Sequence, residues 1–340
     1  MNIQTALASL AEGHDLSQND TREVFTEVMS GEATPAQIGG LLMALRVKGE
    51  TSEEIAGAAE TMRALSTRVS VEVPYLVDTC GTGGSGVKLF NISTAAAFVA
   101  AAAGARVAKH GNRKMTSNSG SADVLEAAGV NLALTPDQIA HCIREVGVGF
   151  LFAQAHHSAM RFAAPVRQEL KVRTMMNVLG PLTNPAGARR QVIGVFSPLW
   201  QVRLAEVSRL LGAEHVLVVH SNGLDEIALD GPSFVIELNG GAITEYEIRP
   251  EDFGITSQAT ESLQANSPET SLELIRQSLT QPDSAAADIV SLNAGAAIYA
   301  AGVATTLAHG VTMAQDAIAA GLANERLEEL VRISRLMGEQ

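Results

Sequence analysis

The sequence predicts an α/β protein with a small N-terminal helical domain and a larger α/β domain, in which helices flank a central, mainly parallel sheet. Three observations support this prediction. The first seventy residues contain helix signals with no strand pattern between them. From Pro74 onward, short apolar strand candidates alternate with helical stretches, as is typical of a parallel sheet. The chain has 340 residues and is 46% hydrophobic, which is enough to bury a large core.

The N-terminal region is predicted as a series of helices. Asp20 and Glu23 have the spacing of a capping box, and Thr34 with Pro35 suits the N-cap and N1 positions of the next helix. Gly49 is placed to end that helix, whose apolar face comprises Ile38, Leu41, Leu42 and Leu45.

The rest of the chain alternates strands and helices, and the last seventy residues return to helix. Strands are predicted at residues 75–79, 106–109, 149–152, 191–196 and 215–220, and helices at residues 135–146 and 199–211. Residues 233–248 alternate strictly around Asn239 and Gly240, which predicts an antiparallel hairpin.

Composition excludes several functional classes. The net charge of −13 has the wrong sign for binding nucleic acid or an anionic membrane, so neither partner is expected. Cys80 and Cys142 are too few for a disulfide framework and lack the spacing of a zinc site, which fits a reducing cytoplasm. The sequence begins without the features of a signal peptide, and its apolar runs are shorter than the roughly 20 residues of a membrane span. We therefore expect a soluble, cytoplasmic protein.

The most informative stretch is DTCGTGGSG, residues 78–86, between a predicted strand and a predicted helix. Its glycines let the backbone approach a ligand closely and direct N–H groups toward it, as in a phosphate cradle. The alternative is a purely structural turn. The following residues open the helix and offer hydroxyls and free amides to a phosphate or a metal, or simply an N-cap; they are Asn91, Ile92, Ser93 and Thr94.

Two further loops carry charge. Residues 109–123, KHGNRKMTSNSGSAD, concentrate Lys109, Arg113 and Lys114 with several hydroxyls in an otherwise acidic protein, which favours an anion site over a solvated surface loop. Asp225 and Glu226 follow an apolar strand, where they suit Mg²⁺ held partly by protein oxygens and partly by substrate phosphates. An isolated acidic pair would more simply be a solvated turn.

Together these strings resemble the anthranilate phosphoribosyltransferase family of tryptophan biosynthesis. The resemblance spans residues 20–335 and rests on the order and spacing of DTCGTGGSG, NIST, KHGNR, SGSAD, APVRQEL, NVLGPLTNPA and GLDE. It implies Mg²⁺-dependent transfer of the 5-phosphoribosyl group from phosphoribosyl pyrophosphate to anthranilate, which gives N-(5-phosphoribosyl)anthranilate and pyrophosphate. Cleavage of the bond to pyrophosphate builds positive charge on the ribose and negative charge on the leaving group. Amides, Mg²⁺-bound groups and Lys109 can therefore stabilise the transition state without a covalent nucleophile.

The resemblance also implies roles for individual residues. Anthranilate would meet Gly81, Asn112 and Arg167, and the metal would meet Ser93, Asp225 and Glu226. No definite catalytic residue is implied: we expect His110 to orient a neighbouring group, and His156 and His157 to form part of the wall. Phosphoribosyl pyrophosphate would be bound by Gly81, Gly84, Ser85, Leu89, Asn91, Ile92, Ser93, Thr94, Lys109, His110, Gly111, Asn112, Arg113, Lys114, Met115, Thr116, Ser117 and Ser121.

The domain organisation follows from the same resemblance. Residues 1–70 would form the helical domain together with a returning segment at 168–186, and residues 71–167 and 187–340 would form the phosphoribosyl-binding domain. The substrate site would lie between the two domains and close around the substrates, because water must be kept from the cationic sugar. A homodimer through the helical domain is expected.

Three residues depart from the family pattern. Ser85 stands where the family usually has Asp, Leu89 where it often has a hydroxyl, and Asn118 where it often has Lys. We expect Ser85 to change the metal dependence, by weakening a second Mg²⁺ site, without abolishing the fold or the transfer.

Three alternative functions remain open at this point. A pyrimidine nucleoside phosphorylase-like enzyme would share the fold but use inorganic phosphate, and its glycine loop has a different pattern (KHSTGG). A non-catalytic nucleic-acid-binding relative would keep the scaffold, although the net charge of −13 argues against it. A transferase acting on another aromatic amine would keep the same phosphoribosyl site.

Overall fold

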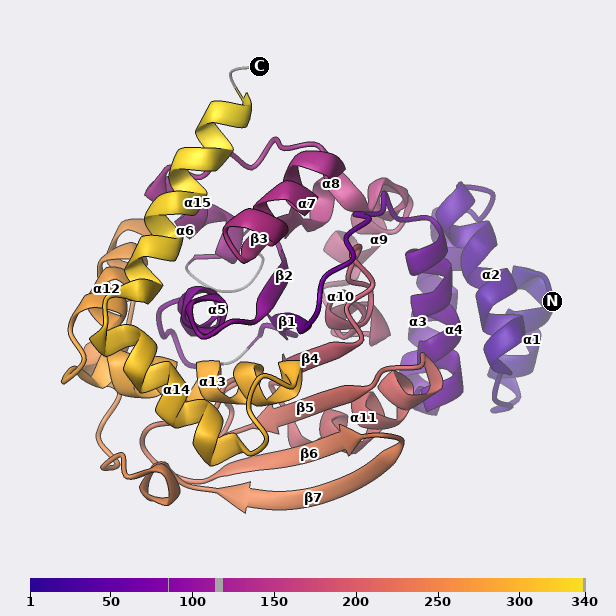
Figure 1. Ribbon diagram of the computed structural model, residues 1–340. Coiled ribbons are helices and arrows are strands. Elements are labelled where there is room, and N and C mark those ends of the chain that lie inside the picture. Colours follow the sequence, from indigo (N-terminus) through magenta and orange to yellow (C-terminus); the bar gives the residue numbers. More distant parts are fainter. Residues whose placement is uncertain (85, 114–118, 339–340) are drawn as a thin grey trace.

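The computed structural model describes residues 1–84, 86–113 and 119–338. Figure 1 shows the N-terminal helices gathered at one side of the molecule, beside a larger part built on a twisted sheet. The N-terminal helices are α1 (Ile3–Ala11), α2 (Gln18–Ser30), α3 (Pro35–Lys48) and α4 (Ser52–Ala64). A small helical domain followed by a larger α/β domain is therefore confirmed.

The ends of the N-terminal helices are set by side-chain caps. The prediction for α3 is confirmed: Thr34 accepts a hydrogen bond from the Gln37 amide, Pro35 is the first helical residue, and the helix stops at Gly49. The predicted capping box of Asp20 and Glu23 is wrong, because Ser17 is the N-cap of α2 and accepts from the Asp20 amide.

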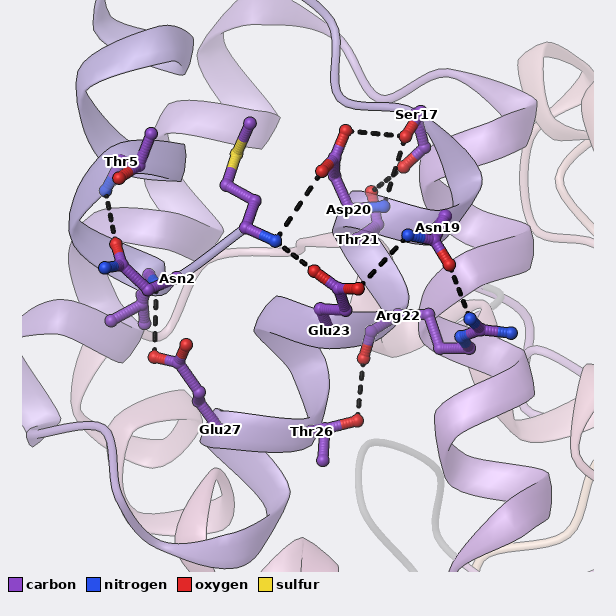
Figure 2. A network of polar contacts seen from close by, with 12 residues as sticks. Asn2, Thr5, Ser17, Asn19, Asp20, Thr21, Arg22, Glu23, Thr26 and Glu27 are labelled. Atoms are coloured by element: carbon purple, nitrogen blue, oxygen red, sulfur yellow. Dashed lines mark hydrogen bonds and ion pairs between the residues drawn. The ribbon is translucent and has the colours of Figure 1, made fainter.

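Asp20 and Glu23 instead face the start of the chain. Figure 2 shows the Asp20 and Glu23 carboxylates near each other on α2. The Met1 ammonium group pairs with both of them, and its nitrogen lies 3.7 Å from Asp20 Oδ1. The Ile3 amide also donates to Glu27 Oε2 at 3.1 Å. The acidic face of α2 therefore anchors the start of α1 and does not cap its own helix.

The sheet of the described residues has seven strands in the order β3-β2-β1-β4-β5-β6-β7. The first five pair in parallel, whereas β6 and β7 are antiparallel, so the mainly parallel sheet and the hairpin are both confirmed. Gly240 and Gly241, both with positive φ, form the hairpin turn. The strands are β1 (Leu76–Gly81), β2 (Arg106–Gly111), β3 (Val148–Phe152), β4 (Arg190–Gly194), β5 (His215–His220), β6 (Ser233–Asn239) and β7 (Ala242–Ile248).

The strand order places a switch point between β1 and β4. From β1 the chain adds β2 and β3 on one side, and then returns to add β4 and β5 on the other side. In such sheets the connections after neighbouring strands at the switch point run in opposite directions, which leaves a crevice at the carboxyl ends of the strands.

Helices cover both faces of the sheet. On β5, Val216 and Val218 pack into a core with α1–α4, whereas Leu217 and Val219 pack into a core with the C-terminal helices. The helices after β1 are α5 (Ile92–Ala102), α6 (Ser121–Ala128), α7 (Pro136–Glu145), α8 (Ala153–His156), α9 (Ala164–Leu170), α10 (Leu179–Leu182), α11 (Gln201–Leu210), α12 (Pro268–Thr280), α13 (Ala285–Ala301), α14 (Leu307–Ala319) and α15 (Leu322–Gly338). Short 3-10 turns are η1 (Ser158–Phe162), η2 (Met175–Asn177), η3 (Pro198–Trp200), η4 (Pro250–Phe253) and η5 (Glu261–Leu263).

One segment from the middle of the chain packs against the N-terminal helices. Val166 on α9, Met175 on η2 and Leu179 on α10 belong to the same core as α1–α4. The division into residues 1–70 with 168–186, and 71–167 with 187–340, stays a prediction. Within the described residues, no helix combines the length and the apolar character that crossing a membrane requires.

Candidate functional site

The motifs found in the sequence converge at the switch point. The Thr82 amide, just after β1, donates to Gly194 O at the end of β4, at 2.8 Å. The next amide, of Gly83, donates to Asp225 Oδ2 at 3.0 Å. The glycine loop and the acidic loop after β5 therefore meet at the carboxyl edge of the sheet, although 142 residues separate them in the chain.

Two glycines permit this close approach. A Cβ on Gly194 would lie 1.7 Å from Asp225 O, and a Cβ on Gly81 would lie 2.7 Å from Asp225 Oδ2. Gly83 and Gly84 have φ angles of +68° and +82°, a conformation that disfavours any residue with a side chain. The glycine content of the loop is thus required both by its own turn and by the carboxylate packed against it.

Lys109 brings a buried positive charge to the same edge. It lies near the carboxyl end of β2, two residues before Gly111, and is only 2% exposed. Its Nζ donates to Thr79 O at 2.5 Å and to Ser93 Oγ at 3.3 Å. Burial lowers the pKa of Lys109, and the carboxylates of Asp78 and Glu226 oppose that change.

Asp78 lies on β1 beneath the loop and is fully buried. It accepts hydrogen bonds from the His110 amide at 3.1 Å and from Asn184 Nδ2 at 2.8 Å. Burial raises the pKa of Asp78 to about 6, despite these bonds and the nearby Lys109. Asn184 also donates to Ala108 O at 2.8 Å, so Asp78 and Asn184 tie β1 to β2.

The acidic pair is firmly held. Glu226 accepts from the Ser93 amide at 3.2 Å, and its main-chain oxygen accepts from Ser221 Oγ at 2.8 Å. Asn293 on α13 accepts from the Ile227 amide and donates to Ile227 O, both at 2.9 Å. Burial and the adjacent Asp225 raise the pKa of Glu226 well above its usual value.

An oxygen-only donor set therefore faces the start of α5. Two carboxylates and the Ser93 hydroxyl are hard ligands of the kind that Mg²⁺ takes, with the remaining positions left to water and phosphate oxygens. Within the described residues no group of three or more His, Cys, Asp and Glu side chains suits a metal, so any shell that these residues gave a cation would be partial. The raised pKa of the Glu226 carboxyl beside Asp225 also fits a site that a cation would complete.

The opening of α5 differs from the N-cap alternative. The Asn91 side chain makes no cap bond; its Nδ2 donates to Ser119 O at 3.1 Å, and its Oδ1 accepts from Ser271 Oγ at 2.7 Å. Thr94 Oγ1 donates to Ser121 Oγ at 3.1 Å. These bonds connect α5 to the basic loop and to α6.

Two of the predicted contact residues have apolar side chains in or against the core. The Ile92 side chain is 1% exposed within the core, and Leu89 is half-buried against that core and bridges to Gln264. Only the main chain of Ile92 is therefore available to a ligand in this arrangement, and neither side chain offers a polar group.

The basic loop is only partly available to an anion. Arg113 pairs with Glu126 at 2.6 Å and Asp123 at 3.4 Å, so its charge is largely balanced within the loop. Asn112 Oδ1 accepts from the Arg113 amide at 2.8 Å, and a Cβ on Gly111 would lie 2.8 Å from the Phe150 ring. Residues outside the described part of the chain are Ser85, Lys114, Met115, Thr116, Ser117 and Asn118.

Arg167 stands apart from the other predicted residues. It lies on α9, among the N-terminal helices, and makes no direct polar side-chain contact with the sheet edge among the described residues. Its guanidinium is half-buried, and no carboxylate of the described residues lies within ion-pairing distance. Burial lowers its pKa. An unpaired, partly desolvated guanidinium is the group expected where a carboxylate ligand binds.

Two buried histidines, His110 on β2 and His157 after α8, lie against each other. His110 Nδ1 bonds Gly180 O at 3.1 Å, and the His110 and His157 ring centroids are 5.1 Å apart. Burial and the His157 ring lower the pKa of His110 to about 3, and burial lowers that of His157 to about 4. Both rings are therefore neutral at neutral pH, and each has a buried Nε2 without a hydrogen-bond partner in the described structure.

Three residues that support the site were not predicted from the sequence. Asp78 follows the apolar residues of a predicted strand, so a charged residue at that place was a usable signal. Asn184 lies in the quoted string NVLGPLTNPA, which does not indicate its bond to Asp78. Asn293 lies on α13 in the string SLNAGAA, and no local pattern indicates that its amide reaches Ile227 across 66 residues.

Comparisons with known proteins agree with this geometry. Residues 4–66 match the family described as "Glycosyl transferase family, helical bundle domain", and residues 73–324 match its "a/b domain". The anthranilate phosphoribosyltransferases of Teredinibacter turnerae and Cellvibrio japonicus are 55% and 56% identical to the chain, each over 99% of this chain and 100% of theirs.

Solved structures give the same result. The crystal structure of anthranilate phosphoribosyltransferase from Thermus thermophilus matches with a TM-score of 0.92 and 45% identity, over 97% of this chain and 99% of that one. The Saccharomyces cerevisiae enzyme, solved in complex with PRPP and Mg, shares the fold with a TM-score of 0.88 and 23% identity over 98% of both chains. The chain belongs to the anthranilate phosphoribosyltransferase family.

Proposed function

We propose that the chain transfers the 5-phosphoribosyl group from phosphoribosyl pyrophosphate (PRPP) to the amine of anthranilate, and that Mg²⁺ assists. The observation that carries this proposal is the meeting of the glycine loop, buried Lys109 and the acidic pair at one switch point. Arg167, which has no acidic partner among the described residues, lies on α9 beside the N-terminal helices and supplies a separate site for a carboxylate. The reaction needs one substrate with phosphates and another with a carboxylate.

The pyrophosphate end of PRPP is assigned to the carboxyl edge of the sheet. The glycine loop and the first turn of α5 offer main-chain N–H groups, and the positive end of the helix dipole adds to them. Lys109 contributes a fixed charge near Ser93. As the bond to pyrophosphate breaks, negative charge grows on the leaving group, and preorganised donors there lower the barrier.

Ser93, Asp225 and Glu226 are the residues that would hold Mg²⁺. Their oxygen-only set and the raised pKa of Glu226 fit a divalent cation that substrate phosphates help to coordinate. When bound, such an ion neutralises the charge of the polyphosphate. Ser221 and Asn293 hold the main chain of Glu226 and Ile227, and so fix the position of the acidic pair.

Arg167 is assigned to the carboxylate of anthranilate. A guanidinium can bind a planar carboxylate with two parallel hydrogen bonds, which orients the aromatic ring as well as holding it. His110 and His157 are assigned to the wall of this site. Their lowered pKa values keep both rings neutral, and the acceptor amine is also neutral, so it needs no charged group beside it. The amine already has a lone pair, so orientation matters more than base catalysis.

A homodimer and a cytoplasmic location complete the proposal. On α3, Ala36, Gly40 and Val47 are exposed and Met43 is half-exposed, which leaves a charge-free apolar stripe on the solvent side of the helix. A helix that has a second apolar stripe opposite its core face is normally covered there as well. A second copy of the N-terminal helices would cover this stripe.

The proposed cytoplasmic location rests on the cysteines. Both thiols are free, which fits a reducing compartment.

The test is the loss of anthranilate fluorescence with the purified protein. The complete mixture contains anthranilate, PRPP and MgCl2, and each component is omitted in turn. We expect fluorescence to fall only in the complete mixture, and replacement of PRPP by ribose 1-phosphate or by inorganic phosphate to give no loss. No loss in the complete mixture at any MgCl2 concentration, with folded protein, would contradict the proposal.

A further inference from the structure

The glycine loop is held at three consecutive residues. Thr82 and Gly83 are fixed through their amides by Gly194 and Asp225, both of which belong to the edge of the sheet itself. The third residue, Gly84, is fixed differently, because its carbonyl oxygen is the bonded group. A carbonyl oxygen carries partial negative charge and would repel a phosphate bound in the loop unless a donor engages it.

Arg173 supplies that donor. Its Nη2 lies 2.7 Å from Gly84 O, and its Cζ lies 4.1 Å from the centroid of the Phe196 ring. Stacking on the ring holds the guanidinium plane, so that the donor keeps its direction. Within the described residues no carboxylate pairs with Arg173, so its positive charge is not balanced by an acid. A guanidinium has five N–H groups, and this contact uses one of them.

Arg173 comes from the segment that carries Arg167. After α9 the chain turns at Lys171, whose φ is +51°, and Arg173 follows two residues later. On either side of this turn, Val166 and Met175 are buried in the core of the N-terminal helices. One segment, anchored in the core at both ends, therefore carries two guanidinium groups without an acidic partner among the described residues. Arg167 lies at the proposed anthranilate site, and Arg173 lies at the glycine loop.

We propose that Arg173 is a positioning residue for PRPP: it engages the Gly84 carbonyl and links the glycine loop to the helical part that binds anthranilate. The proposal rests on the proposed function of the loop. Arg173 acts through Gly84 and through its uncompensated charge, which favours the arrival of a pyrophosphate group. Its role is distinct from that of Arg167, because the two side chains would serve different substrates.

The test compares Arg173→Ala, Arg173→Lys and the control Arg203→Ala. Arg203 is also stacked on an aromatic ring, 5.4 Å from the Trp200 centroid, and does not contact the glycine loop. The Kd for PRPP is measured by calorimetry with MgCl2 and without anthranilate, and both KM values are measured by fluorescence. We expect Arg173→Ala to raise the Kd and KM for PRPP about tenfold or more, with the KM for anthranilate changed less than about threefold.

The other variants make the result specific. Arg173→Lys keeps the charge but loses the planar fork, so we expect it to recover part of the PRPP affinity. Phe196→Leu removes the ring that supports the guanidinium and should raise the Kd for PRPP about threefold, which keeps the proposal testable if Arg173→Ala does not fold. Arg203→Ala should leave the Kd unchanged.

Two outcomes would overturn the inference. One is an unchanged Kd for PRPP in Arg173→Ala protein with a native melting temperature; the other is an equal loss in Arg203→Ala, which would indicate general destabilisation. The calorimetric Kd is independent of turnover. If the unaltered protein binds PRPP but does not consume anthranilate, the proposed function fails, and the Arg173 comparison is still decided by the Kd values.

Discussion

At the scale of single residues, the site depends on small side chains next to fixed charges. Gly194 lies against the Asp225 carbonyl so closely that a methyl group would overlap it. The acidic pair can occupy its position at the end of β5 only because β4 ends in a residue without a side chain. Lys109 and Ser93 depend on the same geometry, because Ser93 contacts both Lys109 and Glu226.

Replacement of Gly194 should therefore damage the metal site. We expect Gly194→Ala to raise the MgCl2 concentration for half-maximal rate at least about tenfold, and to lower the free energy of unfolding by about 1–3 kcal/mol, because the Asp225 main chain must move. Gly231→Ala is the control, since a Cβ there meets nothing within 4 Å. Rate curves that coincide for all three proteins would show that Asp225 is not positioned in this way.

Ser85 lies outside the described residues, so the hypothesis about it is tested in solution. If Ser85 weakens a second Mg²⁺ site, Ser85→Asp should add a carboxylate to that site and shift the dependence of the initial rate on MgCl2 to lower concentrations. Superimposable titration curves for the two proteins would refute this hypothesis.

At the scale of elements, local signals were more informative than long-range ones. The start and end of α3 follow from Thr34, Pro35 and Gly49, because a cap is formed by neighbouring residues. The start of α2 was predicted wrongly because Ser17, an equally good N-cap, comes three residues before Asp20 and begins the helix earlier. The strand order and the contact between Asn293 and Ile227 could not be predicted, since both depend on how distant segments pack.

The antiparallel strands hold a polar network remote from the proposed site. Glu237 on β6 accepts hydrogen bonds from His215, Tyr246 and Tyr299, each at 2.8 Å. Burial alone would raise the pKa of Glu237, but these three bonds outweigh it and lower the pKa to about 2. The network therefore ties β6 to β5, β7 and α13 through an ionised carboxylate.

This network should make stability depend on acid pH. Because the folded pKa lies below the usual 4.5, the contribution of Glu237 is complete above about pH 4.5 and is lost as the pH falls toward about 2. Glu237→Gln should lower the free energy of unfolding by about 1–3 kcal/mol at pH 7 and reduce its decline below pH 4.5. Urea unfolding at several pH values measures both. Equal pH dependence in the two proteins would contradict the assignment.

At the scale of the whole molecule, two cores share one sheet. Figure 1 shows the N-terminal helices on one side and α12–α15 on the other, with the sheet between them. Successive side chains of β4 and β5 pack alternately into one core and then the other. The N-terminal helices therefore pack directly on the sheet that carries the acidic loop. The sequence alone indicated the two parts, but not that they share these strands.

The apolar stripe on α3 predicts the oligomeric state. We expect the native protein to be a dimer by light scattering, and the double variant Met43→Glu with Val47→Glu to be a monomer, because buried like charges oppose association. Val47 is 81% exposed in the single chain, so the substitutions should not unfold it. Leu322→Glu, at an exposed apolar residue on α15, is the control and should stay dimeric. A monomeric native protein would contradict this prediction.

The central claim is that two anion sites receive the two substrates: PRPP binds at the carboxyl edge of the sheet, and anthranilate binds at Arg167 on α9. The most direct measurement is the pair of KM values for Arg167→Ala, with Arg203→Ala as the control. We predict that the KM for anthranilate rises about 30-fold or more while the KM for PRPP stays within about twofold, and that Arg167→Lys recovers only part of the loss. An unchanged KM for anthranilate, or an equal rise in both KM values, would contradict the account.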